Sequence, residues 1–309
     1  MMKNYSVLIF ITGIILILPA MGINTYYLSI LVTSFIFVIF ILSWDVIGGI
    51  CGQLTLGQAL FFGTGTYTFA ALCTILDMPA PAAFAATLFI SLLLALGTGV
   101  FAIKLRGAFF ALFTLALCEM AHEFSLNFPF RSSIDFFVGG EGGIPLFRGQ
   151  GTLDRISLLK EYYLILLFVI LLITALLGLL QKTWGLELKS IAGNEMLAKS
   201  CGIRTERLKL MAYCAAALIA TTGGILYVIH TGRATPSDFS IELSFQAATL
   251  AAVGGRGKIT GPALSAFGIT AIFSMLHISP VIRMTVYALV LPAMLLGSSF
   301  TLFPQRKRL

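Results

Sequence analysis

Long apolar runs that recur along nearly the whole chain constrain its fold more than any other feature. They lie at residues 6–22, 27–45, 58–76, 82–103, 108–127, 161–181, 209–230, 242–253, 262–278 and 281–300. A bilayer core about 30 Å thick needs roughly 20 apolar residues for one helical crossing, so these runs predict about ten transmembrane helices. Only 11% of the 309 residues are charged, well below the roughly 25% of soluble domains. The sequence therefore predicts a polytopic membrane protein.

The runs are continuous rather than alternating with a period of two residues, which favours membrane helices over a transmembrane β-barrel. They leave no room for a separate soluble domain, so we expect one all-α transmembrane domain over residues 1–309. Residues 6–22 have an alternative interpretation as a signal peptide, because Lys3 precedes them and Ala20 and Gly22 offer small residues for cleavage. We favour a retained first helix.

The basic residues predict how the helices are oriented, because short loops rich in Lys and Arg stay in the cytoplasm. If the spans alternate in direction, most of the basic residues lie on one side of the membrane, namely Lys104, Arg106, those of the 182–209 connection, Arg256, Lys258 and those of the tail Arg306–Arg308. Both termini are then cytoplasmic and the 129–160 connection is external. The net charge of +7 follows from this topology, and we expect no nucleic-acid partner.

Residue patterns of enzymes and metal sites are missing. The five cysteines form no CxxC pair, and the three histidines lie far apart without HExxH spacing. "GGRGKIT" at 254–260 resembles a phosphate-binding loop but has Ala252 and Ile259 where that loop needs Gly and Ser or Thr. We expect no catalytic residues, no bound metal and no cofactor.

The segment "GGICGQLTLGQALFFGTGTY" at 48–67 interrupts the apolar pattern with six glycines and two glutamines. Irregular backbone at membrane depth persists only where protein or a water-filled cavity satisfies its polar groups. One interpretation is a solute pathway with a polar lining and an apolar wall, formed by Gln53, Thr55, Gln58, Phe61 and Phe62. The alternative is tight helix packing around the glycines, with the glutamines bonded to adjacent helices.

Two further features lie inside predicted spans. Glu119, with His122 and Glu123 beside it, lies in the 108–127 run, where ionisable groups are costly and suggest function by default. We count Glu119 as a candidate pathway residue, although the group could instead lie in water at the outer helix end. Small residues recur every fourth position from Ala212 to Gly224, which predicts a face that packs closely on another helix.

The 182–209 connection is charged and helical in pattern. Leu188, Ile191, Ala192, Ala198 and Cys201 recur at spacings of three and four, which predicts one amphipathic helix that ends at Gly202. Such a helix can lie on the membrane surface. Alternatively, it fits a groove on a cytoplasmic partner.

Within this connection, "NEMLAKSCGI" at 194–203 resembles the coupling loop of ABC importer permeases, which has an acidic residue, a following alanine and a glycine seven residues after the acid. The resemblance implies that the ATPase contact is made by Glu195, Ala198, Gly202 and Ile203.

A second resemblance covers most of the chain. Four sequence blocks are similar to blocks of the branched-chain amino acid permease family and occur in the same order as in that family. They are "GQLTLGQALFFGTGTYTFAAL" at 52–72, "LRGAFFALFTLAL" at 105–117, "GGEGGIPLF" at 139–147 and "AAVGGRGKITGPALSAF" at 251–267.

The resemblance implies an ABC importer permease fold in the lipid of a bacterial inner membrane. It also implies a second permease subunit, two cytoplasmic ATPase subunits and an external solute-binding protein, with ATP bound only by the ATPases. The implied substrate is a branched-chain amino acid, and urea or a short amide is the alternative. An ion-coupled secondary transporter is a less favoured alternative, for which Glu119 and Glu123 are the candidate ion sites.

Overall fold

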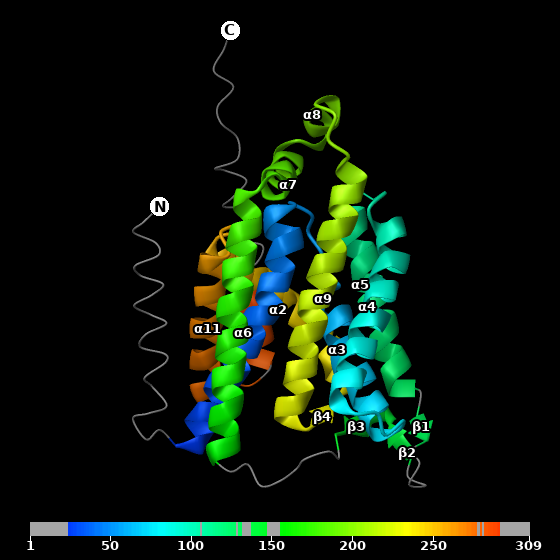
Figure 1. Cartoon of the computed structure of the whole chain (residues 1–309), viewed down its shortest axis with the longest axis vertical. Coiled ribbons are helices and arrows are strands. Elements are labelled where there is room, and N and C mark those ends of the chain that lie inside the picture. The colour runs from blue at the N-terminus through cyan, green and yellow to red at the C-terminus, as the bar shows by residue number, and fades with distance from the viewer. Residues whose placement is uncertain are drawn as a thin grey trace.

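The structure is a computed structural model that describes residues 24–105, 107–127, 129–131, 137–146, 155–276, 279 and 281–290. The predicted first span at 6–22 and the basic tail lie outside these residues. The described chain forms a bundle of helices, with short strands at one end and two short helices at the other (Figure 1). We call these the strand end and the α8 end.

The long helices are α2 (Thr25–Trp44), α3 (Gln58–Thr74), α4 (Ala80–Ala102), α5 (Ala108–Asn127), α6 (Arg155–Gln181), α9 (Thr205–Thr231), α10 (Ile241–Gly254) and α11 (Thr260–Met275). A last helix covers Val281–Val290. The connecting elements are η2 (Asp45–Ile50), β1 (Pro129–Arg131), β2 (Phe137–Gly139), η3 (Gly140–Gly142), β3 (Ile144–Pro145), α7 (Thr183–Gly193), α8 (Glu195–Ser200), β4 (Arg233–Ala234) and η4 (Pro236–Phe239).

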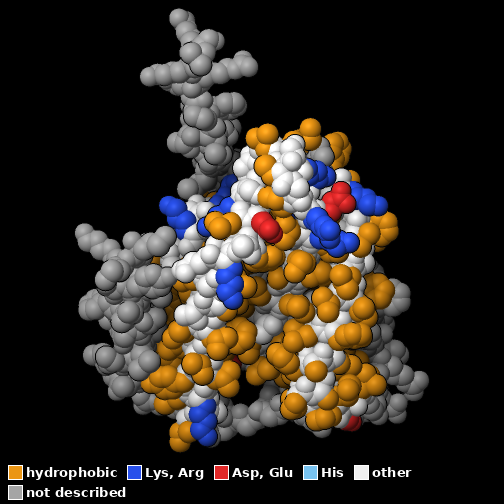
Figure 2. All heavy atoms as spheres, turned by 45° about the horizontal axis from the view of Figure 1, so that its top comes forward, with side chains coloured by type: hydrophobic (Ala, Val, Ile, Leu, Met, Phe, Trp, Pro, Cys, Tyr) orange, Lys and Arg blue, Asp and Glu red, His pale blue; other side chains and the backbone are white. Residues whose placement is uncertain are grey.

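The helix α2 lies at the centre of the bundle. Its apolar window is 89% buried inside the protein, and α2 packs against α6, α9 and α11. The helices α4, α5 and α6 instead expose rows of Leu and Phe side chains, and hydrophobic side chains cover the flanks of the molecule (Figure 2). Exposed apolar flanks around a buried core are what a lipid environment requires.

Each predicted span that falls on described residues contains a helix, but the helices are not uniform. Five are long and apolar enough to cross a membrane, those within 25–50, 80–102, 108–127, 156–181 and 205–231. The helices α3, α10, α11 and Val281–Val290 are shorter, so ten full-length crossings are not confirmed. The helix α6 also begins at Arg155, inside the connection predicted to run to residue 160.

The helix α3 is short because irregular backbone at residues 51–57 precedes it inside the bundle. Trp44 donates its indole N–H to the carbonyl of Thr55 at 2.8 Å, and Leu56 donates its backbone N–H to Thr114 Oγ1 at 3.2 Å. A Cβ added at Gly57 would collide with the backbone of Thr114. Protein groups thus satisfy this polar backbone, as the sequence required.

Asp45 joins the two halves of the chain. Its buried carboxylate accepts hydrogen bonds from the backbone N–H of Gly257 at 2.7 Å and of Ile259 at 3.4 Å. The backbones of Gly254 and Gly261 then meet directly, at the turn between α10 and α11. A carboxylate that accepts backbone N–H groups is a strong interaction in a dry interior, so Asp45 holds this turn against η2.

At the strand end, β1 pairs with β2 and β3 pairs with β4, both antiparallel. The second pair joins Ile144 and Pro145 to Arg233 and Ala234, which ties the outer connection to the end of α9. The small-residue face of α9 packs against α3, because Ala212, Ala216 and Ala220 are buried there. The prediction of a closely packed face is confirmed.

The contact between Gly254 and Gly261 predicts a strong difference between two glycines of α11. Gly261→Ala places a Cβ into the carbonyl of Gly254, whereas Gly268 has nothing within 4 Å. We expect Gly261→Ala to lower the thermal unfolding temperature in detergent. Gly268→Ala should be neutral or stabilise by up to about 1 kcal/mol, because alanine favours the helix. Equal unfolding temperatures for the two variants would contradict the close contact.

The separation of the two ends predicts opposite labelling of two exposed positions, Glu141 in η3 and Lys199 in α8. Cys201 is exposed, so single cysteines are introduced in a Cys201→Ser background. A membrane-impermeant maleimide should modify Glu141→Cys in intact spheroplasts and Lys199→Cys only after permeabilisation. Modification of both positions from one side would contradict this topology.

Candidate functional site

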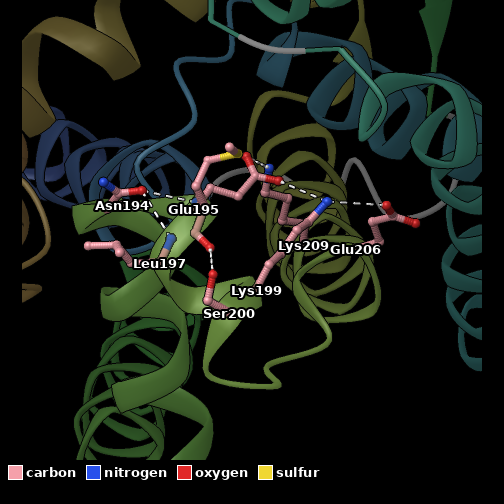
Figure 3. Close-up of polar contacts among 8 residues, drawn as sticks. Asn194, Glu195, Leu197, Lys199, Ser200, Glu206 and Lys209 are labelled. Carbon is pink, nitrogen blue, oxygen red and sulfur yellow. Dashed lines mark hydrogen bonds and ion pairs between the residues drawn. The ribbon is translucent and has the colours of Figure 1, made fainter.

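The helices α7 and α8 project from one end of the bundle (Figure 1), and charged side chains gather at this end in the view of Figure 2. The prediction of one continuous helix here is wrong. The helix α7 ends at Gly193, and Asn194 is extended, with φ −159°. Its Oδ1 accepts from the backbone N–H of Met196 at 3.0 Å and of Leu197 at 3.2 Å (Figure 3). Asn194 therefore starts a new helix as its N-cap.

The predicted apolar stripe divides at this break. Leu188, Ile191 and Ala198 are buried, whereas Ala192 and Cys201 are exposed. The helix α8 ends before Gly202, whose φ of +81° is the left-handed conformation that glycine adopts most easily. Beyond it, the half-buried Ile203 donates its backbone N–H to the carbonyl of Ala198 at 3.2 Å.

An ion pair fixes α8 to α9. Lys209 Nζ lies 2.7 Å from Glu195 Oε2, and the Lys209 side chain is only 2% exposed against 23% for Glu195 (Figure 3). Lys199 lies 3.7 Å from Glu195 and 3.5 Å from Glu206 at the exposed edge. A buried ammonium group is costly without an anionic partner, so Glu195 is held inside the chain.

The outer surface of α8 is apolar at its tip. Met196 and Leu197 are exposed, and the nearby positions in sequence include exposed charged residues, namely Lys199, Arg204, Glu206 and Arg207. The periodic pattern missed Met196 and Leu197, because they are out of phase with the buried stripe. Their signal was present in the sequence as two adjacent apolar residues in a charged connection.

A cavity of about 220 Å³ lies between this projection and the irregular segment after η2. Gln53 lines it together with Glu195, Lys209 and Ile191. The helix α7 also packs against η2. The predicted coupling segment and the predicted pathway segment therefore share one cavity, which their separation in sequence did not reveal.

The other polar residues of the 48–67 segment lie between helices. Gln58 Nε2 donates to Ser43 Oγ at 2.9 Å and to the carbonyl of Ala216 at 3.2 Å. Thr55 is buried and accepts from the backbone N–H of Gly57 at 3.3 Å, while the ring of Phe61 packs on Tyr213. These contacts agree with the packing alternative for Thr55, Gln58 and Phe61.

Phe62 lines a second cavity, of about 300 Å³, which is closer to the strand end. Helices α2, α3, α9, α10, α11 and Val281–Val290 contribute to its wall, together with η4. Phe62 is buried but lines this cavity, whereas Gln58 one turn before it is bonded between helices.

Two buried acids were missed by the sequence analysis, Asp45 and Asp238. Asp238 accepts from the backbone N–H of Thr235 at 3.0 Å and from its hydroxyl at 3.1 Å, which caps η4. Like Asp45, it satisfies backbone at an irregular segment. Both carboxylates therefore satisfy backbone N–H groups at irregular segments, and Asp238 in addition lines the cavity that Phe62 lines.

Glu119, His122 and Glu123 lie on one face of α5. One possible metal-ligand atom from each of the three side chains lies within 4.8 Å of the other two. Spacings of three and four residues place any such trio together on a helix. All three are at least partly exposed, so this geometry assigns Glu119 neither a pathway role nor a metal.

Comparison with known proteins places these features in a family. The family described as "Branched-chain amino acid transport system / permease component" matches residues 26–298. The chain is 27% identical over 250 residues to the high-affinity branched-chain amino acid transport system permease protein LivM of Escherichia coli K12, and 25% identical over 246 residues to LivM of Salmonella typhimurium LT2.

Each alignment covers 73% of this chain and 57% of the relative, so the chain spans a little over half the length of these relatives. No solved structure matches it significantly. The family match, in contrast, extends over most of the sequence and over every helix of the bundle core. The chain therefore belongs to the branched-chain amino acid transport system permease family.

Proposed function

We propose that this chain is the membrane-spanning subunit of an ATP-driven ABC importer that carries branched-chain amino acids into the cytoplasm of a bacterium. The observation that carries the proposal is the α8 projection, an exposed apolar tip on an ion-paired base at one end of a membrane bundle. The membership of the permease family and the names of the LivM relatives support the transported substrate.

In this proposal, the tip of α8 enters a groove on an ATPase subunit. Met196 and Leu197 supply the apolar contact, and the nearby basic residues supply charge. Glu195, Ala198, Gly202 and Ile203 form the base that holds the tip, because Glu195 pairs with Lys209 and Ala198 is buried. This assigns the family's acidic residue to positioning of the helix rather than to direct docking.

Force on α8 then passes into the membrane through α9. Lys209 lies near the start of α9, which extends through the bundle against α3. Gln53 lines the cavity beside the ion pair, so a shift of α8 also moves the irregular segment before α3. The complete importer contains a second permease subunit, two ATPase subunits and an external solute-binding protein.

Rival functions make different demands. A urea or short-amide importer would share the α8 projection but transport neutral solutes. A secondary transporter would work without ATPases and would use acids such as Glu119 or Glu123 as ion sites. Reconstitution of the chain with ATPase and permease subunits encoded beside it, followed by measurement of leucine and urea uptake with and without ATP, separates the three.

The buried ion pair predicts that Glu195→Gln uncouples ATP hydrolysis from uptake. Breaking one partner of a buried pair costs roughly 3–5 kcal/mol, and we expect the lower end because Glu195 is 23% exposed. Leucine uptake by the reconstituted importer should fall while ATP hydrolysis continues, and the unfolding temperature should drop.

The swap Glu195→Lys with Lys209→Glu should recover part of the uptake. Lys199→Ala is the control, because exposed ion pairs contribute only about 0–1 kcal/mol. Wild-type coupling in Glu195→Gln would remove Glu195 from the mechanism.

The exposed tip predicts that Leu197→Asp weakens ATPase binding. A charge in an apolar docking contact is desolvated without a partner, which is unfavourable. The variant should insert normally but copurify with much less ATPase, while Leu197→Met, which keeps the apolar bulk, should behave like the wild type. Undiminished ATPase recovery with Leu197→Asp would place the docking surface elsewhere.

A further inference from the structure

The cavity near the strand end has features that packing alone does not explain. Its volume of about 300 Å³ is at the small end of the range of about 300–1,000 Å³ that small-molecule pockets occupy. It lies inside this one chain, between α2, α3, α9, α10 and α11. A cavity of this size, lined by so many elements, suits a small metabolite.

Two hydroxyl groups at this cavity lack hydrogen-bond partners among the described residues. They belong to Thr270 in α11, which is 3% exposed, and to Tyr287, which is 5% exposed. Both residues line the cavity. Buried polar groups are almost always bonded, and each exception calls for an explanation such as a missing ligand or water. Two such hydroxyls at one cavity therefore indicate an absent polar occupant.

Charges of both signs line the same cavity. Asp238 and Glu242 supply carboxylates, and Arg283 supplies a guanidinium group. The carbonyl of Phe273 accepts a hydrogen bond from Arg283 Nη2 at 2.9 Å, which restrains the position of this charge. Urea can hydrogen-bond to both kinds of group, but it carries no charge and forms no ion pair with either. A zwitterion presents an ammonium group and a carboxylate together, and matches both.

The remaining wall is aromatic. The ring of Phe62 stacks on Phe37 with centroids 6.4 Å apart and packs on Tyr227 with centroids 5.4 Å apart. All three side chains line the cavity. Apolar surface buried against such rings is favourable by roughly 25 cal/mol per Å². The wall therefore suits an aliphatic side chain.

We propose that this cavity is a binding site for an α-amino acid with an aliphatic side chain, within a single permease subunit. The carboxylate of the ligand lies toward Arg283 and the Thr270 and Tyr287 hydroxyls, its ammonium group lies toward Glu242 and Asp238, and its side chain lies against Phe62. The choice of amino acid rests on the proposed function, whereas the site itself rests on the unpartnered hydroxyls and on the charges of both signs that line the cavity.

The test measures binding to the purified full chain in lipid nanodiscs, with any subunits that copurify. The probes are L-leucine, 4-methylpentanoate, which lacks the ammonium group, 3-methylbutylamine, which lacks the carboxylate, and urea. We expect L-leucine to bind and to raise the unfolding temperature. The three other probes should bind at least about tenfold more weakly, because each loses one or more charge-assisted hydrogen bonds.

Isosteric variants then locate the site. Tyr287→Phe and Thr270→Val each remove one hydroxyl and should weaken L-leucine binding by about tenfold. The unfolding temperature without leucine should stay the same or rise, because each variant removes a buried unpartnered group. Thr205→Val is the matched control, since this hydroxyl is also buried and unpartnered but lies outside this cavity, and Tyr67→Phe removes a buried hydroxyl elsewhere in the bundle. The controls should bind leucine normally.

The outcomes separate the site from the proposed function. Wild-type leucine affinity in both Tyr287→Phe and Thr270→Val overturns the site, and the cavity then holds only water. Tighter binding of urea than of leucine overturns the zwitterion assignment. ATP-driven leucine uptake in the assembled importer, with no leucine binding to this chain, overturns the site but leaves the proposed function intact. Leucine binding at the cavity without ATP-driven uptake supports the site but overturns the proposed function.

Discussion

The need to satisfy backbone polar groups inside a membrane protein shapes the rest of this structure. Hydrocarbon offers no hydrogen-bond partners, so irregular backbone survives only where protein surrounds it. Residues 51–57 meet this condition through Trp44 and Thr114. Asp45 does the same for the turn before α11, and Asp238 for η4. These irregular segments shorten α3 and α10, and the two described cavities that Gln53 and Phe62 line lie beside them.

Polar contacts also hold the α8 projection in place. A helix of six residues has few internal hydrogen bonds and is marginal alone. Its cap at Asn194 and its ion pair to Lys209 hold it on α9, so its apolar tip is presented rigidly. In the proposed importer this rigidity matters, because a flexible tip would absorb the movement of an ATPase instead of passing it to the membrane helices. Under that proposal, the buried pair links docking of the tip to the bundle.

Residue patterns predicted what depends on a single element. The small-residue face of α9 is packed as its spacing predicted, and Leu188, Ile191 and Ala198 are buried as their periodicity predicted. The same periodicity extended one helix across Asn194, because a heptad-like pattern carries no information about where a cap interrupts it. Glutamine at position 58 left two interpretations open, and its partners Ser43 and Ala216, from α2 and α9, agree with the packing alternative.

The sequence by itself determined the membrane class, the position of most helices, the family and the segment that contains α8, because apolar periodicity and local motifs report on one stretch of chain at a time. Tertiary structure alone decided which polar groups meet. Thr270 and Tyr287 come from different helices, and Phe62 reaches their cavity from α3. Glu195 meets Lys209 across a turn that reverses the chain. Such meetings depend on how helices pack against one another, and no pattern within a single helix encodes that arrangement.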